Sequence, residues 1–189
     1  LGDVYKRQDH FCKDLDQLYI LTAQRSNGHI SIIDNTDRNN DPNFIDPMKN
    51  PEVEKYSYCI SFKDDYIIVD DHRFQANVLV TDSFFLQLMD YPVISGIKTI
   101  QRPDDAIITR KYAKHLFKDE NPLGKQLVSS AGYTLTIRGI VDEPDTKSSL
   151  QFDLITPVNQ GKYMDWSRMG YCITCLLYTS PSPRDGLLS

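Results

Sequence analysis

The pattern of apolar and polar positions predicts short strands through most of the chain. Apolar and polar residues alternate over residues 133–138, which is the period-two signature of a strand with one buried face. Residues 126–128 are its expected hairpin partner, with the reversal at residues 130–132. The apolar run at residues 106–108 is typical of a buried strand. Further strands are expected at residues 19–22, 66–69 and 74–80.

A different spacing predicts a few short helices between these strands. Thr109 can cap one helix, and either Thr81 or Asp82 can cap another. The first has an apolar face made by Tyr112, Ala113, Leu116 and Phe117, and the second carries Phe84, Phe85, Leu88 and Met89 before ending at Tyr91-Pro92. A third apolar face lies near the start of the chain, at Phe11, Leu15, Leu18 and Tyr19.

Strands and helices follow one another without a regular βαβ rhythm, so the predicted fold class is α+β, with mixed sheet and a few short helices. Residues 34–51 are rich in Asn, Asp and Pro and are expected to form a long irregular connection. No apolar run approaches the roughly 20 residues of a membrane helix.

The two ends of the chain look unlike the protein between them. Residues 1–8, LGDVYKRQ, can be back-translated to a DNA strand whose reverse complement encodes CLLYTSP, the sequence of residues 175–181. One tag read in opposite senses resembles a sequencing adapter joined to both sides of a gene fragment, and such segments are excluded from fold reasoning. We therefore expect residues 1–8 and 175–189 to be adapter-derived, and residues 9–174 to be an incomplete native domain.

Charge argues against a nucleic-acid partner. Without the expected tags, Lys and Arg fall from 21 to 18 and Asp and Glu from 26 to 24, so the net charge changes from -5 to -6. A basic stripe is the usual footprint of nucleic-acid binding, and an acidic chain has no overall excess of positive charge.

The part expected to be native holds Cys12, Cys59 and Cys172 without a repeated short spacing. A disulfide framework or Cys-rich zinc site is thus not indicated, and small buried side chains are expected instead.

The Gly124-Lys125 pair raises the possibility of a phosphate loop. That loop needs a second glycine five positions earlier and a hydroxyl after the lysine. Here those positions hold Asp119 and Gln126. Asn121-Pro122 and Gly124 instead predict a turn in which the glycine has positive φ.

Other candidate chemistry is equally weak. Alternate Asp and Asn residues over 37–43 resemble the start of a calcium loop, but Pro42 and Met48 replace the required Gly and Glu. The pairs Asp64-Asp65, Asp70-Asp71 and Asp104-Asp105 are expected to be hydrophilic turns. The four histidines, at positions 10, 29, 72 and 115, lack the spacing of a helical metal site. We therefore predict no catalytic, cofactor-binding or metal-binding residues, no cofactor and no enzymatic activity.

Five segments in order resemble the MacB-like periplasmic core domain of FtsX/MacB-type ABC transporter permeases, especially those of Bacteroidetes-like bacteria. The matching segments are residues 9–21, 50–55, 78–96, 104–127 and 133–157. The resemblance implies an α+β module of two subdomains. Two departures stand out: Cys12 replaces a frequent His, and residues 146–149 replace a usual Asn-Ser-His pattern.

The resemblance also implies a function. It predicts a domain facing the periplasm from the bacterial inner membrane, which couples ATP-driven motion of membrane helices to a substrate or partner. ATP hydrolysis is then expected in a separate ATPase subunit or domain. A permease dimer and a periplasmic adaptor or substrate are further expected partners. The alternatives are a free-standing secreted or envelope binding module, and an enzyme whose active residues lie outside this fragment.

Overall fold

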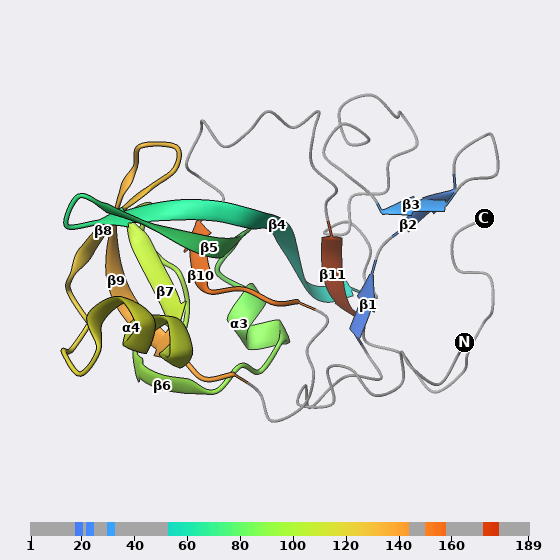
Figure 1. Ribbon diagram of the computed structural model, residues 1–189. Coiled ribbons are helices and arrows are strands. Elements are labelled where there is room, and N and C mark those ends of the chain that lie inside the picture. Colours follow the sequence, from blue (N-terminus) through green and yellow to red (C-terminus); the bar gives the residue numbers. More distant parts are fainter. Residues whose placement is uncertain are drawn as a thin grey trace.

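The computed structural model describes residues 18–20, 22–24, 30–32, 53–143, 150–157 and 172–177. Within these ranges the strands dominate, and the two helices are short (Figure 1). The strands are β1 (Leu18–Ile20), β2 (Thr22–Gln24), β3 (Ile30–Ile32), β4 (Val53–Val69), β5 (His72–Thr81), β6 (Val93–Gly96), β7 (Asp105–Thr109), β8 (Gln126–Ser129), β9 (Thr134–Val141), β10 (Leu154–Pro157) and β11 (Cys172–Leu177). The helices are α3 (Phe85–Leu88) and α4 (Arg110–Phe117).

One large sheet organises the domain. Its strand order is β1-β11-β4-β5-β10-β7-β9-β6, and β8 pairs with both β4 and β9. The β10–β5 and β7–β9 pairs are parallel, whereas the other pairs of this sheet are antiparallel. Because β8 bridges back from β9 to β4, the strands β4, β5, β10, β7, β9 and β8 form a closed ring of pairings. The predicted α+β class with mixed sheet is confirmed.

The central strands β5, β7 and β10 are buried on both faces because a separate core covers each face. Side chains alternate across a strand, so Val78 and Leu79 enter different cores, as do Leu154 and Ile155. The first core includes Tyr112, Ala113 and Phe117 of α4, and the second includes Phe85, Leu86 and Leu88 of α3. Helix α4 therefore packs in the first core, and helix α3 packs in the second.

The hairpin prediction and one of the two helix caps are confirmed. Thr109 caps α4 by accepting a hydrogen bond from the Tyr112 N–H at 3.2 Å. The cap predicted for α3 at Thr81 or Asp82 is wrong, because the N-cap is Phe84 and no side chain caps this single turn. Asp82 Oδ1 instead accepts from the Phe84 N–H at 2.9 Å, before the helix begins. The predicted hairpin is formed by β8 and β9, and Gly132 between them has φ of +84°.

The boundary expected at residue 174 stays a prediction. Strand β11 runs across it, since Cys175, Leu176 and Leu177 continue the antiparallel pairing with β4.

The first helix, expected near residue 11, and the irregular connection over residues 34–51 lie almost wholly outside the described ranges. Residues 18 and 19 of that expected helix fall in β1 instead. No helix among the described residues is long and apolar enough to span a membrane.

Candidate functional site

A pocket of about 280 Å³ lies where the β5–α3 connection meets the β6–β7 connection. Its lining combines hydroxyl, charged and apolar groups, so it offers both hydrogen bonds and small apolar surfaces. The lining residues are Thr81, Asp82, Ser83, Ile100, Gln101, Arg102, Pro103 and Pro157. This volume is slightly below the roughly 300 Å³ at which typical ligand pockets begin, so it has room for one small group.

Buried hydroxyls fix the wall made by the β5–α3 connection. Ser57 on β4 donates to Asp82 Oδ1 at 2.8 Å, and its hydroxyl lies 3.1 Å from that of Thr81. Ser57 and Thr81 are both fully buried. Since buried polar groups must be paired to avoid a desolvation cost, these bonds define where the Asp82 carboxylate sits.

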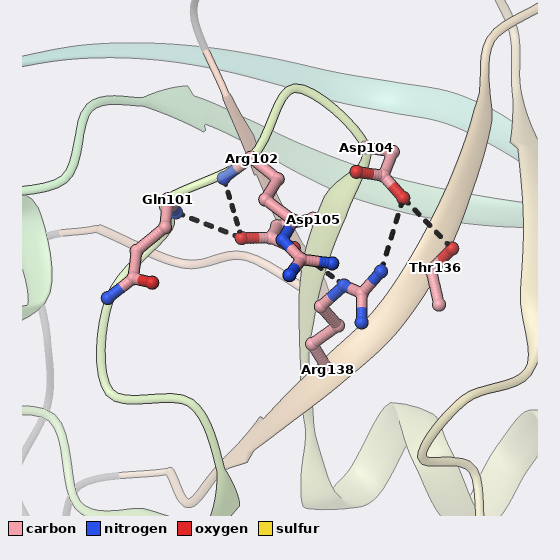
Figure 2. Close-up of polar contacts among 6 residues, drawn as sticks. All are labelled: Gln101, Arg102, Asp104, Asp105, Thr136 and Arg138. Atoms are coloured by element: carbon pink, nitrogen blue, oxygen red, sulfur yellow. Dashed lines mark hydrogen bonds and ion pairs between the residues drawn. The ribbon is translucent and has the colours of Figure 1, made fainter.

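The opposite wall is fixed by the buried carboxylate of Asp105, the first residue of β7 (Figure 2). Asp105 Oδ2 accepts hydrogen bonds from the N–H groups of Gln101 and Arg102, at 2.9 and 2.8 Å. Asp105 is only 1% exposed. The Asp105 side chain therefore holds the backbone of Gln101 and Arg102, two of the residues that line the pocket.

Arg138 on β9 neutralises this carboxylate. Its Nε lies 2.8 Å from Asp105 Oδ1, an ionic contact whose angle does not make a hydrogen bond. The same guanidinium reaches Asp104 Oδ2 at 3.4 Å, and Thr136 donates to that oxygen at 3.3 Å (Figure 2). Loss of hydration acts to raise the pKa of Asp104, but the backbone bond, Arg138 and Thr136 together lower the pKa below its ordinary value.

A direct hydrogen bond joins the two walls. The hydroxyl of Thr99 donates to the carbonyl oxygen of Ser83. Hydrogen bonds within the protein therefore hold both walls. The side chains of the pocket show no nucleophile aligned with a general base, and the described residues contain no cluster of potential metal ligands.

The Gly124-Lys125 pair forms a turn, as predicted. Gly124 has φ of +84°, and its N–H donates to the Ile137 carbonyl at 2.7 Å. Lys125 pairs with Glu120 and lies over the Phe117 ring at 4.6 Å. The hydrogen bond and charge of Lys125 lower the pKa of Glu120. The backbone and the lysine are therefore both engaged within the protein.

The other candidates are dispersed. His72 and His115 are exposed, and His115 packs against the rings of Phe74 and Tyr112. Cys59 is 2% exposed, which confirms the expectation of a buried side chain. The possible calcium loop at residues 37–43, together with His10, His29 and Cys12, lies outside the described part of the chain.

The prediction of a hydrophilic turn is wrong for Asp105. Asp70 and Asp71 have positive φ and are exposed, as turn residues would be, but Asp105 is a buried ion-pair partner. The prediction is also wrong for Asp64-Asp65, which lies within β4 at a shift in its register with β5. The signal that could have revealed the buried Asp105 is Arg138, a charged residue within an alternating strand. Its contact with residue 105 depends on the parallel β7–β9 pairing, which local sequence does not encode.

The sequence matches the family described as the MacB-like periplasmic core domain over residues 2–179. The chain therefore belongs to the family of MacB-like periplasmic core domains. No curated protein matches it by sequence.

Solved structures share this fold at low sequence identity. A domain of a protein described as a permease from Porphyromonas gingivalis aligns with a TM-score of 0.66 and 17% identity, covering 91% of this chain and 77% of that one. The periplasmic region of MacB from Actinobacillus actinomycetemcomitans gives 0.63 and 17%, covering 89% and 76%. The extracellular domain of the noncanonic ABC-type transporter YknZ from Gram-positive bacteria gives 0.58 and 16%, covering 86% and 83%.

Proposed function

We propose that this domain acts outside the cytoplasmic membrane as the coupling domain of a MacB/FtsX-type ABC transporter permease. The observation that carries the proposal is the family match over residues 2–179. In this role the domain converts ATP-driven motion of membrane helices into the handling of a substrate or partner in the periplasm. The inner membrane is the corresponding location, and ATP is hydrolysed by a cognate ATPase subunit or domain rather than by this one.

Within this role, the pocket between the β5–α3 and β6–β7 connections is the proposed contact for a substrate or a periplasmic adaptor. Its walls are held from β4 and β9, so a force on the large sheet would be transmitted directly to the lining residues. The N–H groups of residues 101 and 102 are hydrogen-bonded to Asp105, which links them to β7. A dimer of permeases, each carrying one such domain, is the proposed assembly.

The test uses the uninterrupted permease gene, expressed with its ATPase in a bacterial membrane. We expect deletion of residues 53–157 to leave the basal ATP hydrolysis of the complex intact while transport, or partner capture, is lost. The matched point variant is Arg102→Ala in the pocket. The control for loss of a cation is Lys111→Ala, at an exposed position of α4.

The proposal fails if the gene encodes a signal peptide and no membrane spans. That result would favour a secreted binding module, because a permease needs apolar spans of about 20 residues. It also fails if transport is unchanged in the deletion variant.

A further inference from the structure

The strand pairing places two cysteines directly opposite one another. Cys59 lies in β4 and Cys172 begins β11, and they are Cα partners in the antiparallel register between these strands. The sequence shows no short Cys spacing that would have indicated this pair, because 112 residues separate them. Only the return of β11 to β4 brings the two positions together.

The backbone geometry suits a covalent link. Directly opposite residues of an antiparallel pair have Cα atoms about 4.5 or 5.5 Å apart, depending on whether the pair is hydrogen-bonded. Disulfides span Cα distances of roughly 4.4 to 6.8 Å. The register therefore meets the Cα-distance requirement of a cross-strand disulfide. In this structure Cys59 is reduced, and its Sγ lies 3.5 Å from Thr81 Oγ1.

The surroundings of Cys59 would protect a disulfide once it had formed. Cys59 belongs to the second core, with Leu79, Phe85 and Ile155, and it is nearly inaccessible. Burial in apolar surroundings makes a thiol inert, whereas exposed thiols with a lowered pKa are the reactive ones. A disulfide formed here would be shielded from reductants after folding.

We propose that Cys59 and Cys172 form a structural disulfide that fastens β11 to β4. Formation proceeds by thiol–disulfide exchange with a disulfide oxidant. One cysteine thiolate attacks the oxidant and expels a thiolate, and the second cysteine thiolate then attacks the mixed disulfide and expels the other. The two cysteines lose two protons and two electrons, and the oxidant is reduced to two thiols.

The compartment supports the same conclusion and rests on the proposed function. Disulfides persist in the bacterial periplasm and are rare in the cytosol. An extracytoplasmic domain would therefore meet the oxidant during or after export. The geometric argument stands separately, so it can be tested on the purified chain irrespective of transport.

The experiment refolds the complete 189-residue chain from denaturant in glutathione disulfide, so that the oxidant reaches Cys59 before folding buries it. Remaining thiols are then blocked with N-ethylmaleimide in denaturant, and peptides are mapped by mass spectrometry. We expect one linked peptide pair joining Cys59 to Cys172, lighter than the two thiol peptides by two hydrogen atoms, whereas Cys12 and Cys175 should carry the maleimide. Protein refolded in reductant instead should have a lower thermal midpoint.

Variants separate the proposed pair from others. Cys172→Ser should abolish the linked peptide and the effect of reductant on the thermal midpoint. Cys175→Ser is the matched control, because it lies in the same strand opposite Tyr56, and it should leave both unchanged. Full maleimide labelling of Cys59 and Cys172 after oxidation would overturn the proposal. A linkage of Cys59 to Cys12 or Cys175 would overturn it as well.

Discussion

Two Asp-Asp pairs occupy opposite environments. Asp70-Asp71 joins β4 to β5 at a hairpin tip, where both residues are exposed and have φ of 47° and 64°. Asp104-Asp105 ends the β6–β7 connection, where the second carboxylate is buried against Arg138. The first turn is set by local backbone preference, whereas the second is set by contacts between distant strands. Identical dipeptides thus tell little about whether a connection is held locally or by tertiary structure.

The largest loss of stability is expected at Gly96, the last residue of β6, where the β6–β7 connection begins. Its φ is +82°, and an added Cβ would lie 1.9 Å from the carbonyl oxygen of Arg138. Gly96→Ala should therefore combine backbone strain with a steric clash, costing about 3 to 5 kcal/mol of unfolding free energy. Denaturant titration checks this. A loss below about 1 kcal/mol would show that the β6–β9 contact yields easily.

Removing the buried carboxylate should cost slightly less. Asp105→Ala leaves two backbone N–H groups without their acceptor and leaves the Arg138 guanidinium with Asp104 alone, at 3.4 Å. Breaking a buried ion pair costs about 3 to 5 kcal/mol, and partial exposure of Arg138 places the expected loss near the lower end, at about 3 kcal/mol. Urea unfolding measures it. The matched Asp71→Ala at the exposed tip should cost less than 1 kcal/mol, and equal losses at both sites would remove the contrast.

The turn at Gly124 should show the cost of positive φ alone. An added Cβ at this position would meet no atom within 4 Å, so only backbone strain opposes substitution. Gly124→Val is expected to destabilise the protein by roughly 1 to 3 kcal/mol. Thermal and denaturant unfolding measure the change. A variant as stable as the parent would show that this turn is not set by its glycine.

At the hairpin tip, a stabilising change is expected. Asp71 has φ of 64°, a conformation that glycine adopts more readily than a residue with a Cβ. Asp71→Gly should raise the unfolding free energy by up to about 1 kcal/mol, partly offset by the greater entropy of the unfolded chain. A small loss of stability would mean that this entropy outweighs the strain. Comparison with Asp70→Gly supplies the control.

The smallest stability effect is expected at Lys125. Lys125→Ala should change the unfolding free energy by less than about 0.5 kcal/mol, as surface substitutions usually do. Because the hydrogen bond and charge of Lys125 lower the pKa of Glu120, that pKa should rise in the variant. The weak stabilisation from this pair is present above the unfolded pKa of Glu120 and is lost as the pH falls through its lowered folded pKa. NMR titration of the Glu120 carboxyl measures the shift, and an unchanged pKa would contradict the pairing.

Local patterns predicted the elements better than the site. The Thr109 cap, the alternation at residues 133–138 and the Gly124 turn depend on residues within a few positions, and the structure agrees with each. The α3 helix is shorter than its apolar spacing suggested, since Phe85, Leu86 and Leu88 serve the core in a single turn. Periodicity does not determine how far an element extends once packing fixes its ends.

The pocket could not be predicted because it depends on strand order. Thr81 and Pro157 meet there only since β10 lies parallel to β5. Asp105 meets Arg138 only since β7 lies beside β9. The same limitation applies to Cys59 and Cys172, whose opposition follows from the β4–β11 register. Family resemblance indicated the architecture, but it did not indicate these side-chain contacts.

The position of β10 has a consequence for biosynthesis. This strand lies between β5 and β7, yet it is formed by Leu154–Pro157, well after both neighbours in the chain. A nascent chain that has emerged only as far as β9 therefore has two strands with unfilled pairing edges. Such edges favour aggregation, and nonlocal pairing slows folding. We expect productive folding to begin only after residue 157 has emerged, which makes premature folding during translation or export unfavourable.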